Sequence, residues 1–97
     1  MRLSFFTYIL KCADNSYYTG HTDNLEGRIY QHNEGVFPDC YTFNRRPLTL
    51  VYSQMFATRE EALASERQIK GWSRAKKEAL INGDWEAVVR LSKSRGR

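Results

Sequence analysis

The sequence predicts one small α/β (α+β) domain, in which a sheet of a few strands is flanked by helices. With 97 residues, the chain is too short to form two units that each bury a core. Hydrophobic residues make up 41% of it, which is enough apolar material to offset the entropy lost on folding. Stretches of strand character and stretches with helix-start signals follow one another. We expect the domain at residues 1–92 and a basic disordered tail at residues 93–97.

The first expected element is a β-hairpin, whose connection decides which tyrosines share a face. Aromatic and β-branched side chains dominate residues 4–12 and residues 16–22. Because the side-chain period of a strand is two, a two-residue connection would put Tyr8 and Tyr18 on opposite faces. A three-residue connection, with Asn15 in the left-handed conformation, pairs Tyr8 with Gly20 and brings both tyrosines to one face. We expect the three-residue connection.

A helix, a loop and a third strand follow the hairpin. Asp23 begins a capping-box pattern and Gly35 is a stop signal, which together predict a helix over about residues 24–34. Residues 35–47 contain glycine, proline, aspartate and asparagine without a period, and they are predicted to form a loop. Residues 48–56 are predicted to form the third strand.

The C-terminal part of the chain is predicted to be helical. Thr58 and Glu61 form a second capping-box pattern. The helix that follows has one apolar stripe, made by Ala62, Leu63, Ile69 and Trp72. After Gly71, two shorter helices are expected at residues 73–81 and residues 84–92.

The apolar and cysteine content excludes several classes of protein. No apolar run is long enough to cross a bilayer, and the N-terminal apolar residues end at Lys11 without a cleavage pattern. Cys12 and Cys40 have neither CxxC spacing nor a histidine cluster beside them. We therefore expect no membrane contact, free thiols and a cytoplasmic location.

Positive charge is concentrated at the C-terminal end. The net charge is +4, but residues 1–66 hold 6 basic and 8 acidic side chains, whereas residues 67–97 hold 9 and 3. Such a surface favours a polyanionic partner, because it attracts phosphates and releases their counterions. The candidate nucleic-acid-binding residues are Arg45, Arg46, Lys70, Arg74, Lys76 and Lys77.

One carboxylate lies where an apolar residue is expected. Glu66 follows Leu63 by three residues and precedes Ile69 by three, inside the stripe that should face the core. An unpaired buried charge is costly, so the side chain needs a cation, a metal or a solvent-filled cleft. Helical spacing alone favours a surface pair with Lys70, four residues on.

A second set of polar residues is expected to face the same sheet. Arg28 and His32 lie four residues apart on the predicted first helix, so both lean towards the strands. Taken singly, Arg28 could cover apolar surface with its stem and His32 could be a hydrogen-bonded structural residue. Together with the two tyrosines and Glu66 they suit phosphodiester cleavage, which needs a metal ligand, a guanidinium for the phosphate and a proton acceptor.

The same residues carry a family resemblance. The tripeptide TYI and, ten residues on, YTG with its structural Gly20 resemble the two half-motifs of the GIY-YIG nucleases. Phe6 and Thr7 replace the Gly and Ile of the first half-motif. Arg28 and His32 in GRIYQH resemble the Arg-xxx-His helix of the family, and the glutamate of ASERQIKGW resembles its metal ligand. The series is especially similar to small stand-alone bacterial members.

This resemblance implies a fold and a mechanism. The fold would be a three-stranded antiparallel sheet with flanking helices, of the GIY-YIG type. A single Mg²⁺ or Mn²⁺ would be held by Glu66. The resemblance favours Glu66 as a metal ligand over Glu66 as a surface ion pair with Lys70. Tyr8 or Tyr18 would help to deprotonate the attacking water, Arg28 would stabilise the phosphate, and His32 would orient or share the proton transfer.

The leading interpretation is a metal-dependent endonuclease of low sequence specificity acting on DNA or RNA, with DNA as the first choice and no small-molecule cofactor. The alternative is a catalytically weak nucleic-acid-binding module that keeps the fold. A third interpretation is a protein-interaction domain whose basic helices meet an acidic partner. The complete series of tyrosines, arginine, histidine and glutamate favours the enzyme, because binding alone needs no metal-holding carboxylate.

Overall fold

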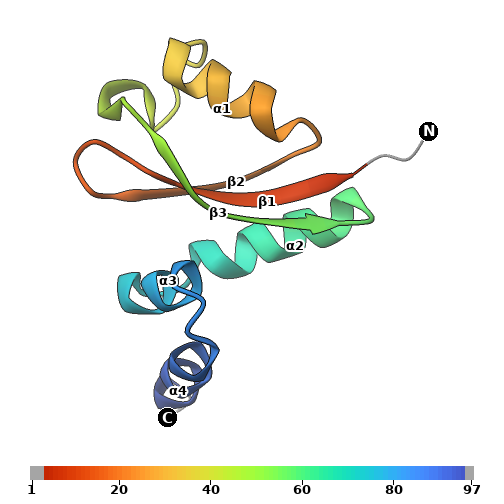
Figure 1. Cartoon of the computed structure of the whole chain (residues 1–97), viewed down its shortest axis with the longest axis vertical. Helices are drawn as coiled ribbons and strands as arrows, with labels where there is room; N and C mark the ends of the chain where they lie inside the picture. Colours follow the sequence, from red (N-terminus) through yellow and green to blue (C-terminus); the bar gives the residue numbers. More distant parts are fainter. Residues whose placement is uncertain (1–3, 96–97) are drawn as a thin grey trace.

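The computed structural model describes residues 4–95, with the side chains up to Ser92. Its main elements are β1 (Phe5–Lys11), β2 (Tyr17–Thr22), α1 (Leu25–Glu34), β3 (Thr49–Phe56), α2 (Arg59–Lys70), α3 (Arg74–Ile81) and α4 (Trp85–Arg95). The strands form one antiparallel sheet in the order β2-β1-β3. Helix α1 covers one face of the sheet, α2 covers the other, and α3 and α4 follow α2 (Figure 1). The predicted α+β class and three-stranded sheet are confirmed.

The hairpin has the predicted three-residue connection. The backbone N–H of Cys12 donates to the carbonyl of Ser16 at 2.8 Å, which closes the turn. Asn15 adopts the left-handed conformation with a φ of 70°. In the resulting register Tyr8 lies opposite Gly20, so both tyrosines of the candidate site lie on one face of the sheet.

The side chains of neighbouring residues in the central strand β1 point to opposite faces of the sheet. Tyr8 turns towards α1, where its hydroxyl is hydrogen-bonded to His32. Thr7 turns towards α2, and its hydroxyl donates to the carbonyl of Ala62 at 2.7 Å. Both β1 residues are fully buried. The strand therefore carries one polar contact to each of the two covering helices.

Apolar side chains form two clusters among the described residues. The cluster between the sheet and α1 contains Tyr8, Leu10, Cys12 and Leu48, with Tyr18, Leu25 and Ile29 packed against it. The second cluster joins α3 to α4 and contains Ala79, Ala87 and Val88, with Trp72, Leu80 and Leu91 beside it. The first cluster forms the floor of the candidate site.

The helix ends follow the capping chemistry of the sequence. The side chain of Asn24 accepts from the N–H of Gly27 at 3.2 Å, so α1 is capped one residue later than the Asp23 signal predicts. Gly35 ends α1 with a φ of 73°, in the left-handed region that glycine adopts without strain. Helix α2 begins with the predicted capping box of Thr58 and Glu61.

The loop after α1 is tied back to the helix that precedes it. The side-chain amide of Asn33 donates to the carbonyl of Leu48 at 3.2 Å, and its oxygen accepts from the N–H of the same residue at 2.8 Å. Between them the chain forms a short 3₁₀ turn, η1 (Phe43–Arg45). Thr42, just before this turn, is only 1% exposed. The loop thereby places side chains against the C-terminal half of α1.

Helix α4 runs further than the sequence analysis predicts. The expected helix covers residues 84–92, but α4 continues to Arg95, so residues 93–95 are helical where a disordered tail is predicted. Gly96 is the first stop residue in this stretch, and nothing earlier ends the helix. Residues 96–97 lie outside the described part. Among residues 4–95, no helix has the length and apolar character needed to span a membrane.

Candidate active site

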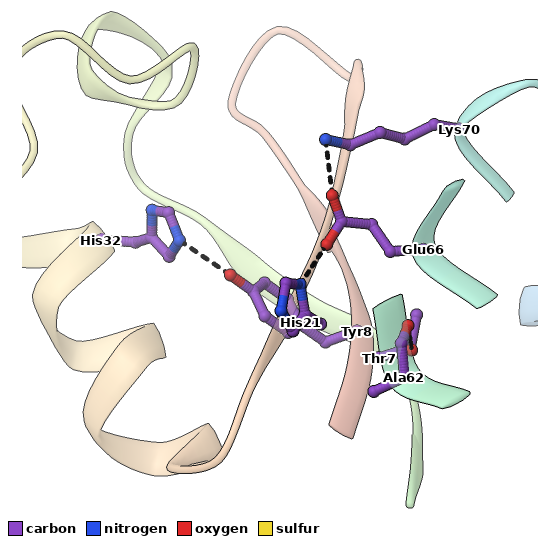
Figure 2. A network of polar contacts seen from close by, with 7 residues as sticks. All are labelled: Thr7, Tyr8, His21, His32, Ala62, Glu66 and Lys70. Atoms are coloured by element: carbon purple, nitrogen blue, oxygen red, sulfur yellow. Dashed lines mark hydrogen bonds and ion pairs between the residues drawn. The ribbon is translucent and has the colours of Figure 1, made fainter. Parts of the chain in front are cut away.

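A buried pair of proton-carrying groups lies between β1 and α1. The hydroxyl of Tyr8 and Nε2 of His32 are 3.1 Å apart, and Figure 2 shows the two side chains meeting between sheet and helix. Tyr8 is fully buried and His32 is 3% exposed. His32 lies on the inner side of α1, as its spacing of four residues from Arg28 on the helix predicts. Sequence reasoning predicts this convergence, and the structure brings the two residues into contact.

The second tyrosine stands beside this pair, and a glycine makes the arrangement possible. The ring centroid of Tyr18 is 6.4 Å from that of Tyr8 and 5.2 Å from that of His32. A Cβ atom on Gly20 would lie 2.6 Å from the hydroxyl oxygen of Tyr8 and 3.2 Å from the Tyr18 ring. Gly20 is therefore required because the Tyr8 side chain passes directly over it.

Arg28 supplies the positive charge on this side of the sheet. Its guanidinium carbon lies 5.4 Å from the centroid of the Phe37 ring. Burial raises the pKa of Tyr8 to about 12, while Arg28 acts in the opposite direction. Burial and then Arg28 lower the pKa of His32 below its usual value of 6.5. At neutral pH the site therefore holds a protonated phenol, an uncharged imidazole and a fixed cation.

Glu66 comes from α2, on the other side of the sheet. One carboxylate oxygen lies 2.5 Å from Nδ1 of His21 on β2, and the other accepts from Nζ of Lys70 at 2.8 Å (Figure 2). Burial raises the pKa of Glu66, but the hydrogen bonds from Lys70 and His21 outweigh it, so the pKa is below the usual 4.5. The group is an ionised carboxylate at the β2 edge of the sheet.

The five predicted site residues therefore form two groups. Tyr8, Tyr18, Arg28 and His32 are in one cluster on the α1 side, whereas the hydrogen-bond and ion-pair partners of Glu66 among the described residues are His21 and Lys70. Its charge still contributes to the raised pKa of both tyrosines. In addition, Nζ of Lys70 is 6.0 Å from the centroid of the Tyr18 ring, which links the two groups.

The donor set fits one hard divalent cation held by one carboxylate. A carboxylate has about four lone-pair positions, and His21 and Lys70 occupy two of those of Glu66. Within residues 4–95, no group of three or more His, Cys, Asp or Glu side chains could hold a metal. Mg²⁺ is commonly bound by one or two carboxylates together with water and phosphate, which is what Glu66 can offer.

The predicted nucleic-acid-binding residues differ in their accessibility. Arg45 stacks on Tyr41 and pairs with Asp14 at 3.1 Å, and Arg46 donates to backbone carbonyls. Arg74 is 53% exposed and stacks on Tyr17, the residue before Tyr18. Lys70 is half exposed beside Glu66, and Lys77 is partly buried.

Lys76 does not fit the expected role. It is 6% exposed, and its Nζ lies 4.0 Å from the centroid of the Trp72 ring. A buried ammonium stacked on an aromatic ring stabilises packing between helices and is not available to a phosphate. The prediction that Lys76 contacts nucleic acid is therefore corrected: spacing on α3 shows the charge but not the indole that covers it.

Three residues of the site are missed by the sequence analysis. His21 could have been found, since the strand period places it on the α2 face with Thr19. Thr42 and Cys40 follow from no periodic signal, because they lie in the irregular loop after α1. The Thr42 hydroxyl is 2.9 Å from Nδ1 of His32 and donates to Sγ of Cys40 at 3.4 Å. Both cysteines of the chain are free thiols, as predicted.

This fold and these side chains define a class of protein. The family model described as the GIY-YIG catalytic domain matches residues 4–79. The chain therefore belongs to the GIY-YIG family, and its domain is of the nuclease type that the half-motifs indicate.

Relatives share the domain over most of their length. A UPF0213 protein of Staphylococcus haemolyticus is 49% identical over 76 residues, which cover 78% of this chain and 92% of the relative. The solution NMR structure of a UPF0213 protein from Bacillus halodurans has a TM-score of 0.54 at 39% identity, covering 93% of this chain and 98% of the other. A protein from E. faecalis gives 0.57 at 31% identity, covering 86% and 90%. The chain is thus similar to small proteins of the UPF0213 type.

Proposed function

We propose that this domain is a metal-dependent endonuclease that hydrolyses phosphodiester bonds, in DNA first and with low sequence specificity. The observation that carries the proposal is the buried contact between Tyr8 and His32, with Arg28 beside it. A protonated phenol in contact with an uncharged imidazole, with a guanidinium beside them, can form a proton acceptor next to a phosphate-binding cation. The reducing conditions that keep both thiols free are those of the cytoplasm, where we place the enzyme.

Each residue has a defined task in the proposed reaction. Tyr8 and His32 receive the proton of the attacking water, and their burial keeps bulk water from taking it instead. Arg28 neutralises the charge that develops on the phosphate oxygens. When bound at Glu66, a divalent ion supplies Lewis-acid stabilisation of the phosphate and the leaving oxygen. Lys70 and His21 hold the Glu66 carboxylate in place.

Low specificity follows from the chemistry of the proposed contacts. The accessible cations Arg45, Arg46, Lys70 and Arg74 can pair with phosphates, which carry no sequence information. Selection among substrates would then rest on the shape of the nucleic acid.

A panel of substrates tests the proposal directly. Pure protein is incubated with labelled single-stranded, duplex and branched DNA and with RNA, in Mg²⁺, in Mn²⁺ or in EDTA. Cleavage in either metal and none in EDTA is the expected result. Binding without cleavage of any substrate in both metals would contradict it.

That contrary result would favour the alternative, a nucleic-acid-binding module with weak catalysis. One observation supports it: both oxygens of Glu66 already have partners, one at 2.5 Å and one at 2.8 Å. If neither His21 nor Lys70 yields to a metal ion, the domain would bind phosphates without cutting.

The pH dependence of cleavage should reflect the histidine. His32 must be uncharged to accept a proton, and its pKa lies below 6.5, so the rate should fall with decreasing pH with a midpoint below pH 6.5. The pKa of Glu66 is below 4.5, so a loss between these two values belongs to His32 and not to the carboxylate. The measurement is kcat/KM across this range, with Mn²⁺ binding recorded in parallel. A midpoint above pH 6.5 in the profile of kcat/KM would contradict the role of His32.

Nucleic-acid affinity should depend on the cations of α3. Arg74→Gln combined with Lys77→Gln should weaken binding in EDTA and lower the slope of log affinity against log salt by about 1 for each phosphate left unneutralised. The matched control is Arg59→Gln combined with Arg90→Gln, which removes the same charge elsewhere on the surface. Equal effects in the two double variants would mean that only net charge matters.

A further inference from the structure

We propose that Thr42 and Cys40 are positioning residues that hold His32 as the tautomer whose unprotonated Nε2 faces Tyr8, ready to receive the phenol proton. The catalytic role of this tautomer rests on the proposed nuclease function. The tautomer itself is a property of the folded chain and can be observed without catalysis. Neither loop residue belongs to the half-motifs, the arginine–histidine helix or the glutamate.

The direction of the hydrogen bonds follows from one hydroxyl. Oγ1 of Thr42 lies 2.9 Å from Nδ1 of His32 and 3.4 Å from Sγ of Cys40. A hydroxyl has one proton to donate and two lone pairs that accept. If the proton goes to the sulfur, Oγ1 must accept from Nδ1–H, and the other ring nitrogen then carries no proton.

The surroundings of the sulfur send the Thr42 proton there. The hydroxyl of Thr42 donates to Sγ of Cys40 at 3.4 Å, and hydrogen bonding by Thr42, Tyr18 and the backbone of Tyr41 acts on the pKa of the same thiol. Burial raises the pKa of the Cys40 thiol, yet these donors outweigh it and the pKa is lowered. Because the sulfur accepts the proton of the Thr42 hydroxyl, that proton points away from the imidazole.

The loop that carries these residues is anchored on both sides. Asn33, next to His32 on α1, holds the loop end at Leu48 through two hydrogen bonds of 3.2 Å and 2.8 Å. On the hairpin side, the N–H of Ala13 donates to the carbonyl of Arg45 at 2.8 Å. Thr42 between these anchors is 1% exposed, so water does not compete for its hydroxyl.

This arrangement separates the two tyrosines by role. Tyr8 donates its proton to Nε2 of His32, so the O–H bond breaks, an N–H bond forms, and the phenolate oxygen takes a proton from the attacking water. The water oxygen bonds to phosphorus, the bond to the leaving oxygen breaks, and that oxygen takes a proton from solvent. The ring of Tyr18 also lies beside His32, but the two nitrogens of that imidazole are hydrogen-bonded to Tyr8 and Thr42.

Nitrogen NMR of the histidine ring tests the assignment without any substrate. The chain has two histidines, so spectra of ¹⁵N-labelled protein with His21→Gln as a reference identify His32. Wild type is expected to show protonated Nδ1 and unprotonated Nε2. Thr42→Val removes the hydroxyl at constant shape and should move the proton to Nε2, whereas Thr42→Ser should restore the wild-type pattern. A wild-type proton on Nε2, or an unchanged pattern in Thr42→Val, would overturn the proposal.

Cys40→Ala is a second variant that tests the tautomer of His32. It replaces the first test if Thr42→Val does not fold. Without the sulfur, the Thr42 hydroxyl is free to donate to Nδ1, so both tautomers should be populated. A single wild-type tautomer in folded Cys40→Ala would contradict the role of the sulfur. Melting temperatures on the same samples establish that each variant is folded.

Kinetics separate this inference from the function on which it rests. Thr42→Val should lower kcat by about 10- to 100-fold with KM unchanged, as loss of an orienting partner does, and Thr42→Ser should keep most of the rate. If wild type has the expected tautomer but cuts nothing, the proposed function fails and the tautomer assignment stands. If wild type cuts and Thr42→Val keeps the full rate, the positioning role fails and the nuclease stands.

Discussion

Glu66→Gln is expected to remove metal-dependent cleavage almost completely while the domain stays folded. The amide keeps the shape of the side chain but loses the negative charge that attracts a hard cation. The loss should be roughly 10³-fold or more, since a metal ion supplies several kcal/mol of transition-state stabilisation. Stability should fall by about 1 kcal/mol or less, because the Lys70 partner is half exposed and returns to solvent.

The decisive comparison is wild type against Glu66→Gln in Mg²⁺, with melting temperature and binding in EDTA measured on the same samples. Lys70→Met is the matched comparison, because it removes the other half of the ion pair and keeps the negative charge of Glu66, which retains its contact with His21. If the pair were only structural, the lysine variant would unfold more easily and the glutamine variant would still cut. Full activity in folded Glu66→Gln would contradict the assignment of Glu66 as the metal ligand.

Tyr8→Phe should have the second largest effect, a loss of about 10²- to 10⁴-fold in the cleavage rate. The ring still fills the space above Gly20, but Nε2 of His32 loses the hydroxyl 3.1 Å away. Losing one buried hydrogen bond should cost about 1 kcal/mol of stability. Tyr18→Phe is the control, since it removes a phenol from the same sheet face while the hydrogen bonds of His32 to Tyr8 and Thr42 remain.

Single-turnover cleavage and affinity in EDTA, measured for both tyrosine variants, provide the test. Substrate affinity should stay near wild type in each, because neither phenol carries charge at neutral pH. A larger loss in Tyr18→Phe than in Tyr8→Phe would reverse the roles assigned to the two tyrosines.

The sequence predicted those parts of the fold that depend on local chemistry, such as strand register and helix ends. Strand period and the tolerance of Asn15 for the left-handed region were sufficient to predict the hairpin register, and hence the shared face of the two tyrosines. The capping box at Thr58 set the start of α2. Helical spacing likewise placed His32 on the inner side of α1.

Long-range placement could not be derived in this way. The stripe position of Glu66 predicts burial but not which face of the sheet α2 covers, nor that His21 reaches the carboxylate. Lys76 has the spacing of a surface cation, yet the Trp72 ring lies over it. Thr42 belongs to a loop whose course is set by tertiary hydrogen bonds, so no period in the sequence points to its contact with the histidine.

The three-residue turn of the hairpin has an evolutionary consequence. It is an exposed turn, the kind of place where families ordinarily accept insertions and deletions. One residue added or removed there would shift the register and carry Tyr18 to the opposite face, because alternate residues of a strand face opposite ways. Natural selection should therefore preserve the length of this turn as strictly as the identity of the tyrosines, and should keep asparagine or glycine at position 15, where the backbone is left-handed.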